Sequence, residues 1–109
     1  MKKEYRIKKS KEIEEVLKNK KYYANPYFSI YIKENNDNHH FRYAISVSKK
    51  IGKAVVRNRL KRQIRAIMDQ LIIADNVDLF IIVRNNILVI DYHEMDKQIK
   101  YLLHKLKVL

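Results

Sequence analysis

The sequence has 109 residues, with 24 Lys and Arg against 12 Asp and Glu, and its formal net charge is +12 at pH 7. This length predicts one domain, residues 1–109, with a single core and no room for the deep pocket of a large enzyme. The absence of cysteine excludes disulfides, thiolate metal sites and a thiol nucleophile. The charge favours a polyanionic partner, either a phosphate polymer or an anionic membrane surface. No apolar run is long enough to span a membrane, and the first residues lack the apolar core of a signal peptide, so we expect a cytoplasmic protein.

The chain is predicted to begin with a basic arm over residues 1–9, which we expect to be flexible. Ser10 is a plausible N-cap for a first helix that ends near Asn19. The apolar stripe of this helix comprises Ile13, Val16 and Leu17, which recur at helical spacing. Tyr22 and Tyr23 follow the helix, and we interpret them as packing residues or as the rim of a groove.

Two long strands are predicted next. In residues 27–33 every second residue is apolar, and the other face carries Tyr27, Ser29, Tyr31 and Lys33. That face suits either base stacking or an amphipathic boundary at the surface. In residues 41–48 one face is apolar, and the other offers small side chains and one cation: Arg42, Ala44, Ser46 and Ser48. Small side chains allow a helix or a nucleotide strand to approach this second strand closely.

A polar loop over residues 34–40 joins the two strands and contains His39 and His40. Adjacent side chains diverge, and no third ligand lies nearby in the sequence, so we expect no specific metal site there. A hairpin connection is the simpler interpretation.

The stretch from Gly52 to Leu71 carries the strongest signal in the sequence. Its apolar residues fall on one face of a helix, at Val56, Leu60, Ile64, Ile67 and Leu71. Between Lys49 and Arg65 there are eight basic residues and no acidic one. Like charges three or four residues apart repel by roughly 0.2–0.5 kcal/mol per pair, so a purely structural helix would intersperse glutamate. A solvated basic face is the alternative, but the uninterrupted charge favours a polyanion site.

Residues 46–65 also carry a resemblance. The run Ser-Val-Ser-Lys-Lys-Ile-Gly-Lys-Ala-Val-Val-Arg-Asn-Arg-Leu-Lys-Arg-Gln-Ile-Arg resembles the signature of the protein subunit of bacterial ribonuclease P. Its hallmark is Arg57-Asn58-Arg59. The segment Ser-x-Ser-Lys-Lys-x-Gly-x-Ala-Val precedes this hallmark at the spacing that the family has. The resemblance covers nearly the whole chain, from Tyr5 to the capping box of the last helix.

The remaining elements complete the predicted fold. Residues 77–84 form a near-continuous apolar run, which predicts a strand buried on both faces inside the sheet, parallel to the strand before the basic helix. Asp91 and Glu94 form a capping box for a last helix that buries Met95, Ile99, Leu102, Leu103 and Leu106. We therefore predict an α+β fold, an α/β sandwich of order α-β-β-(β)-α-β-α in which helices pack on a mixed sheet. The general rule favours a right-handed crossover, whereas the resemblance implies an unusual left-handed one.

The chain offers no recognisable catalytic group. None of its serines lies near a His–Asp pair in a known motif, and no carboxylate cluster has the spacing of a two-metal site. A single glycine cannot supply a phosphate-binding loop. No catalytic residue and no side-chain metal cluster are therefore predicted, although an indirect role with metal is left open for Asn58.

The resemblance implies a function that needs no catalytic side chain. Ribonuclease P is an RNA enzyme: its RNA subunit holds Mg²⁺ and removes the 5′ leader of precursor tRNA to give the mature 5′ end. The chain would be an accessory subunit that binds this RNA through its basic helix and helps to retain metal ions. The expected contacts are Lys49, Lys50, Lys53, Arg57, Asn58, Arg59, Lys61, Arg62 and Arg65.

The resemblance also implies a cleft for the single-stranded leader, between the first helix, the sheet and the basic helix. Family members often carry aromatic residues at the positions of Ile13 and Leu17, so stacking from the first helix is an open question in this chain. The residues expected in the cleft are Ile13, Leu17, Tyr31, Arg42, Ser46 and Ser48.

Two functions from other classes compete with this interpretation. A ribosomal or RNA-chaperone protein fits the charge and size equally well, and it predicts no stimulation of precursor tRNA processing. A helix-turn-helix DNA reader requires two adjacent helices, whereas the pattern here places a strand before the basic helix.

Overall fold

Four strands form one mixed sheet, and the last strand in the sequence lies inside it. The computed structural model describes residues 3–109. The sheet has the order β1-β2-β4-β3, and its strands are β1 (Tyr22–Ala24), β2 (Phe28–Glu34), β3 (Arg42–Val47) and β4 (Val77–Val83). Strand β2 is antiparallel to β1 and β4, whereas β3 is parallel to β4. The predicted α+β fold with a mixed sheet is confirmed, and its third strand before α2 is present, although it is β1 at residues 22–24, where no strand was predicted.

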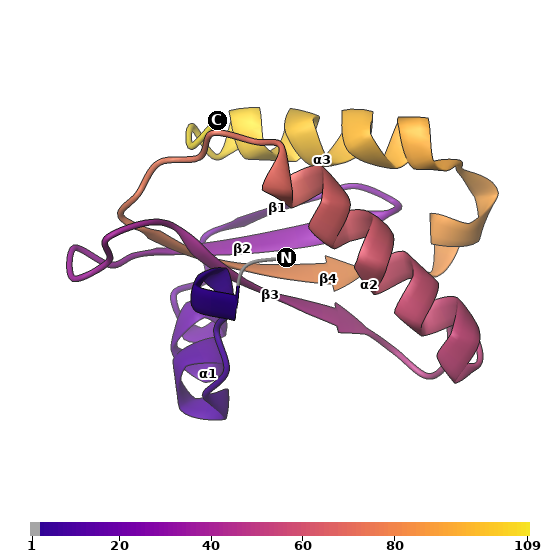
Figure 1. The fold of residues 1–109 in the computed structure, drawn as a ribbon, viewed down its shortest axis with the longest axis horizontal. Coiled ribbons are helices and arrows are strands. Elements are labelled where there is room, and N and C mark those ends of the chain that lie inside the picture. Colours follow the sequence, from indigo (N-terminus) through magenta and orange to yellow (C-terminus); the bar gives the residue numbers. More distant parts are fainter. Residues whose placement is uncertain (1–2) are drawn as a thin grey trace.

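Three helices pack on this sheet from different directions. They are α1 (Ser10–Lys18), α2 (Ala54–Asp69) and α3 (Tyr92–Lys105), with short 3-10 helices η1 (Lys3–Tyr5) and η2 (Asn85–Val89). Helix α3 runs along the top of the sheet and α2 crosses beside it, whereas α1 stands apart at the lower left (Figure 1). The predicted parallel β3-α2-β4 unit is confirmed, and the left-handed sense of its crossover stays a prediction. Within residues 3–109, none of the helices has the length and apolar character needed to cross a bilayer.

One side of the sheet, which we call the closed face, faces α2 and α3 and holds the core. The alternation read from the sequence puts one set of side chains on this side: Phe28, Ile30, Ile32, Tyr43, Val47, Leu79, Ile81 and Val83. They pack against the apolar stripes of the two helices, at Leu60, Ile64, Ile67 and Met68 of α2 and Met95, Ile99, Leu102 and Leu103 of α3. Burial of each such side chain contributes about 1.5–3 kcal/mol, so this face supplies most of the apolar stabilisation.

The predicted start of α1 is wrong by one residue. Lys9 is the N-cap, with φ −84° and ψ 125°, and no side chain caps the helix. Ser10 is already the first helical residue, so its hydroxyl is not placed to accept from the first-turn amides. By contrast, the predicted cap of α3 is confirmed, because the Asp91 carboxylate accepts a 2.8 Å hydrogen bond from the Glu94 amide.

The predicted flexible arm needs a correction in its second half. Ile7 is only 3% exposed, and its amide donates to the Tyr43 carbonyl at 2.9 Å. Arg6 forms an isolated parallel bridge with Tyr43, so residues 6–7 extend the sheet beside the first part of β3. An apolar residue inside a basic stretch is what holds this segment, while Met1 and Lys2 lie outside the described residues.

Candidate nucleic-acid interface

The outer face of α2 is built by the same periodicity that builds the core. Arg59, Arg62 and Asn58 are exposed, and Arg57, Lys61 and Arg65 are partly buried. None of the ion pairs formed within residues 3–109 involves a basic residue between Lys49 and Arg65. The cations of this helix therefore carry charge that no carboxylate of the described chain neutralises through an ion pair.

Two arginines of this helix, Arg57 and Arg65, are not fully exposed to solvent. The Arg57 Nε donates to the Gly52 carbonyl at 3.2 Å, which holds its guanidinium against the turn before the helix. Arg65 is partly buried and its Nε is shielded from solvent, so it is less exposed than Arg59 and Arg62, and its predicted contact with RNA stays a prediction. The helical wheel places Arg65 opposite the apolar stripe but cannot show that residues 6–7 and β3 lie beside it.

The turn from β3 into α2 brings three more cations to the start of the helix. Lys49, Lys50 and Lys53 are exposed there. The Ser48 hydroxyl accepts from the Lys50 amide at 3.2 Å, and this bond orders the turn. A Cβ on Gly52 would lie 3.1 Å from the Val56 side chain, so glycine allows this turn to approach the helix closely. Lys53, the N-cap of α2, provides no side-chain cap, which leaves the first-turn amides without that partner.

The side of the sheet turned away from α2 and α3 carries aromatic and small side chains in place of the aliphatic core of the closed face. We call the two less covered rows of this side the open face. The strand register aligns two rows of side chains across the sheet there. The first row is Tyr22, Tyr31, Phe80 and Ala44, and the second is Ala24, Ser29, Ile82 and Ser46. Phe80 and Ile82 are only partly buried, so the prediction that β4 is covered on both faces is wrong for this half.

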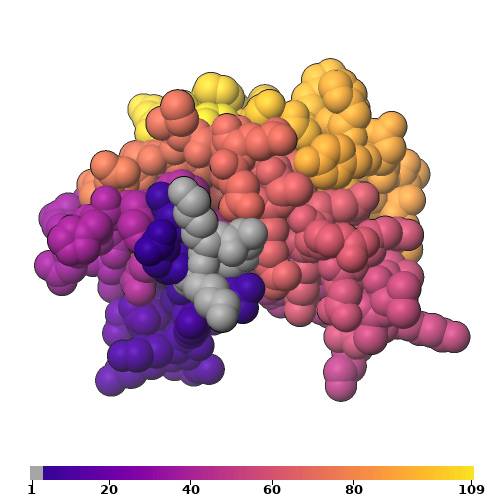
Figure 2. All heavy atoms as spheres, viewed as in Figure 1, coloured from indigo at the N-terminus to yellow at the C-terminus, as the bar shows by residue number. Residues whose placement is uncertain are grey.

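Helix α1 forms one wall beside the open face. Its Val16 is fully buried, and Ile13 and Leu17 flank it with partial exposure. The surface is indented between the indigo α1 and the start of α2, drawn in pink (Figure 2). Ile13 of this wall lines a pocket with Ala44 and Ile45 of β3. Tyr31 and Ser46 lie on the side of the sheet that faces α1, whereas Ser48 lies beyond the strand in the turn.

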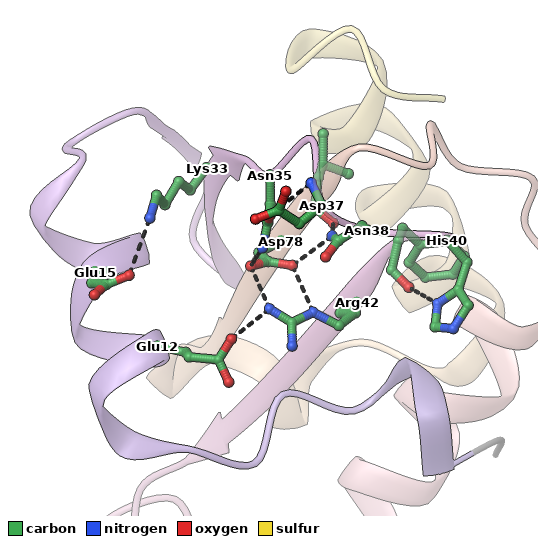
Figure 3. A network of polar contacts seen from close by, with 11 residues as sticks. Glu12, Glu15, Lys33, Asn35, Asp37, Asn38, His40, Arg42 and Asp78 are labelled. Carbon is green, nitrogen blue, oxygen red and sulfur yellow. Dashed lines mark hydrogen bonds and ion pairs between the residues drawn. The ribbon is translucent and has the colours of Figure 1, made fainter.

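A third row on the same side of the sheet is polar and consists of Lys33, Asp78 and Arg42. Its side chains bind α1 through ion pairs (Figure 3). The Arg42 guanidinium donates to both oxygens of Asp78, at 3.0 and 2.8 Å, and to Glu12 of α1 at 2.7 Å. Asp78 is 3% exposed, and Asn35 and Asn38 also donate to its carboxylate. Beside this network, Lys33 pairs with Glu15 at 3.1 Å.

This network corrects the role predicted for Arg42. The residue lies on the predicted sheet side, but its guanidinium is engaged by two carboxylates instead of being offered to a ligand. The hydrogen bond with Asp78 is the main reason why the pKa of Arg42 is raised above its ordinary value. Burial by itself raises the pKa of Asp78, but the hydrogen bonds from Arg42 and the two asparagines outweigh it and lower that pKa.

Sequence reasoning missed the aromatic neighbour of Tyr31. The ring of Tyr22 stacks on that of Tyr31, with 4.6 Å between the ring centroids and 20° between the planes. Tyr22 is 49% exposed, so a stacked pair of tyrosines stands at the β1 edge of the open face. Strand β1 has three residues, which is too short for its alternation to be recognised in the sequence.

Within residues 3–109 there is also no group of three or more His, Asp or Glu side chains placed to hold a metal ion. The candidate interface therefore consists of a basic helix whose cations form no ion pair within the described residues, beside a partly covered sheet face with aromatic and small polar residues. Cationic walls with stacking platforms are typical of proteins that bind single-stranded nucleic acid. The fold and the site define a small basic α+β protein of the RNA-binding class.

Comparisons with known proteins identify the family. The family model described as Ribonuclease P matches residues 1–107. The ribonuclease P protein component of Enterococcus faecalis is 40% identical over 111 residues, which cover 100% of this chain and 94% of that protein. The corresponding protein of Streptococcus pneumoniae is 41% identical over 110 residues, which cover 99% of this chain and 86% of that protein.

Solved structures agree with the family model. The Staphylococcus aureus RNase P protein has a TM-score of 0.87 at 34% identity, with 95% of this chain and 96% of that chain covered. The Thermotoga maritima RNase P protein has a TM-score of 0.81 at 26% identity, with 92% and 96% covered. The chain belongs to the ribonuclease P protein family. It is thus a protein component of a tRNA-processing ribonuclease that works with an RNA partner.

Proposed function

We propose that the outer face of α2 binds the catalytic RNA of ribonuclease P and that the open face binds the 5′ leader of precursor tRNA. The observation that supports the first part is the set of cations between Lys49 and Arg65, which form no ion pair within residues 3–109. Two RNA molecules repel each other, and a chain of net charge +12 placed between them screens that repulsion and releases counterions. The RNA performs the hydrolysis, and this chain contributes binding and positioning.

Magnesium has a place in this proposal through the RNA. The RNA subunit would hold the Mg²⁺ ions, and Asn58 and its neighbouring arginines would lie close enough to influence how firmly the RNA retains them. Because guanidinium groups neutralise phosphate charge, they lower the Mg²⁺ concentration that RNA needs to hold its active shape. The reaction belongs to the cytoplasm, where precursor tRNA is made in bacteria.

The open face suits a leader whose sequence varies. Stacking accepts any base, because every base has a π-face, and it is worth about 1–3 kcal/mol per base. Helix α1 carries Ile13 and Leu17, which have no ring to stack, whereas Tyr22 and Tyr31 stand across the groove as a stacked pair. We therefore assign base stacking to the β1–β2 side of the groove, with apolar packing from α1.

Cleavage of precursor tRNA tests the first assignment. The chain is mixed with a bacterial ribonuclease P RNA and precursor tRNA at limiting Mg²⁺, and formation of the mature 5′ end is measured. Stimulation is expected for the wild type, and Arg59→Ala is expected to weaken it without loss of folded structure. Lys97→Ala removes an equivalent exposed charge from α3 and serves as the matched control. RNA binding without stimulation would instead identify an RNA chaperone.

Leader length tests the second assignment. The affinity of the holoenzyme for precursor tRNA is measured as the leader is extended one nucleotide at a time. Tyr31→Ala and Tyr22→Ala are each expected to reduce the gain per nucleotide by about 5-fold or more. Tyr23→Ala is the matched control, because Tyr23 is similarly exposed at 46% but pairs with Ile30 on the other side of β1. An equal loss for all three variants would contradict the groove.

A further inference from the structure

Helix α1 meets the sheet along a narrow stripe of side chains. The stripe consists of residues spaced three and four apart, which lie on one face of a helix: Glu12, Glu15, Val16 and Asn19. Within Ser10–Lys18, Val16 is the one buried residue. Helix α2, by contrast, buries four apolar side chains. Because apolar burial is non-directional and small here, burial by itself leaves the position of α1 on the sheet loosely defined.

Polar contacts from the same stripe supply the direction that burial lacks. The Glu12 carboxylate accepts from Arg42 of β3 at 2.7 Å, and Glu15 accepts from Lys33 of β2 at 3.1 Å. The Asn19 amide, one residue past the helix, donates to a backbone carbonyl of β2 at 3.0 Å. These contacts reach the two strands that lie on either side of β4. They therefore define where α1 lies across the sheet.

The contact with Arg42 is the most rigid of these, because its guanidinium is itself fixed to the sheet (Figure 3). Its Nε and Nη2 donate to the two oxygens of Asp78, at 3.0 and 2.8 Å, and Nη2 also donates to Glu12. Asp78 is 3% exposed and accepts further hydrogen bonds from Asn35 and Asn38. A guanidinium held by two parallel hydrogen bonds cannot rotate freely, so β4 sets the position of Glu12 through Arg42.

The ion pair between Lys33 and Glu15 is looser. Its two side chains are 37% and 48% exposed, against 22% and 31% for Arg42 and Glu12. An ammonium is a point charge on a flexible stem, so it accepts its partner in several positions. Release of Glu12 from Arg42 therefore frees the first half of α1 to move over the sheet.

Movement of α1 near Glu12 displaces the wall beside the open face. Ile13 follows Glu12 directly and lines a pocket with Ala44 and Ile45 of β3. Leu17 lies about one turn further along the helix. A strand of RNA that touches α1 and the open face together requires these side chains at one distance from the sheet. Its affinity is reduced by the fraction of molecules in which α1 takes another position.

We propose that Arg42 and Glu12 are positioning residues for the leader, because the bridge that they form with Asp78 sets the distance between α1 and the open face. The inference rests on the proposed function, which takes the 5′ leader as the strand that lies there. Neither side chain needs to touch the leader. The bridge keeps α1 in the position that binds, and loss of the bridge lets α1 take positions that do not.

The leader dependence of holoenzyme affinity tests this role. The affinity for precursor tRNA with a long leader is divided by the affinity for precursor tRNA with a one-nucleotide leader, and we call this ratio the leader gain. Arg42→Lys keeps the charge, so the general attraction to RNA is unchanged, but an ammonium cannot hold two carboxylates in one plane. The variant is expected to lower the leader gain about 3- to 5-fold, the upper range for a partly exposed ion pair. Arg84→Lys is the matched control, because Arg84 is exposed and donates to the Asn25 carbonyl.

A variant on the helix side leaves the buried carboxylate with its partner. Glu12→Met removes the acceptor on α1 and keeps the pair of Arg42 and Asp78. Because loss of a negative charge raises the affinity for RNA in general, Glu14→Met at an exposed position of α1 is the matched control. Relative to this control, Glu12→Met is expected to lower the leader gain by the same factor of about 3 to 5. Thermal unfolding checks that every variant is folded at the assay temperature.

Spin labels measure the position of α1 directly, because the chain has no cysteine of its own. Lys11→Cys on α1 and Lys97→Cys on α3 place labels at two exposed positions, and pulsed electron paramagnetic resonance gives the distribution of distances between them. The wild type and Arg84→Lys are expected to share one narrow distribution, whereas Arg42→Lys and Glu12→Met are expected to broaden it. A residue that only stabilises the fold would leave this distribution unchanged in the folded chain.

The outcomes separate this inference from the proposed function. If the wild type shows a leader gain that either variant leaves unchanged relative to its control, the inference is overturned while the leader assignment stands. A lower leader gain with an unchanged distance distribution overturns it as well. If the wild type shows no leader gain, the proposed leader site fails, and this inference fails with it.

Discussion

The two sides of the sheet are stabilised by different interactions: apolar burial on one side, and hydrogen bonds and ion pairs on part of the other. On the closed face, neighbouring strands present apolar side chains with almost no exposure, as at Ile30, Leu79 and Ile81. On the other side, the hydrogen-bonded row of Arg42 and Asp78 holds α1, and the rows of Tyr31 and Ser29 are only partly covered. The comparison teaches that one sheet can carry most of its core on one face and leave part of the other face less covered.

The largest expected difference lies between two adjacent isoleucines of β4. Ile81→Ala on the closed face is expected to lower the free energy of unfolding by about 3–4 kcal/mol, because the side chain is fully buried. Ile82→Ala on the open face is expected to cost about 1 kcal/mol or less, because the side chain is partly exposed. Urea unfolding of the two variants measures both values. Equal losses would contradict the division of the sheet into a closed and an open face.

Breaking the network under α1 is expected to have the next largest effect. Arg42→Met leaves the buried Asp78 carboxylate without its guanidinium, and we expect a loss of about 3 kcal/mol. This is the low end for a buried pair, because the Arg42 side chain is 22% exposed. Arg62→Met removes an exposed guanidinium of α2 and is expected to change stability by about 0.5 kcal/mol or less. Similar losses would show that the two arginines do not differ in role.

The polar row is also expected to make the stability of the protein sensitive to acid, through Asp78. The lowered pKa of Asp78 means that its contribution to stability is present above the unfolded value of about 3.9 and is lost as the pH falls through the folded value. The free energy of unfolding of the wild type is therefore expected to fall below pH 4 more steeply than that of Asp78→Asn. Urea titrations between neutral pH and acid give both slopes, and parallel slopes would remove Asp78 as the acid-sensitive group.

The smallest expected effects come from two lysines that follow helices. Lys20 follows α1 and Lys107 follows α3, and their φ angles of 55° and 62° are left-handed. Glycine removes the strain, worth about 1–2 kcal/mol, but adds unfolded-state entropy, so a net gain of about 0.5 kcal/mol is expected for Lys107→Gly. Lys20→Gly is expected to gain the same only if α1 unfolds together with the core. Thermal unfolding of both variants therefore shows whether the two sides of the sheet melt as one unit.

The closed face could be predicted because its signals are local. Alternation in residues 27–33 and 41–48, and helical spacing in α2 and α3, each name the inward residues without knowledge of the neighbours. The basic face of α2 was predictable for the same reason, since the face opposite a periodic apolar stripe follows from the stripe.

The open face was only partly predictable because its contacts are distant in sequence. Arg42 and Asp78 are separated by 36 residues, and nothing local to either shows that they will pair. The apolar run of β4 does not reveal that α1 leaves Phe80 and Ile82 partly uncovered. Nor does the alternation of residues 41–48 reveal that Arg6 and Ile7 pair with the first part of β3 and that Ile7 is buried there.

The position of β4 has a consequence for how the chain acquires its structure. Strands β2 and β3 do not pair with each other, since β4 lies between them and is the last strand to be synthesised. During translation the first half of the chain can therefore form only the β1–β2 ladder and the short pairing of residues 6–7 with β3, and the sheet closes only after residue 83 has left the ribosome. Because these pairings are non-local, refolding is expected to be slow for a protein of this size, and the nascent segment emerges unfolded and strongly basic beside ribosomal RNA.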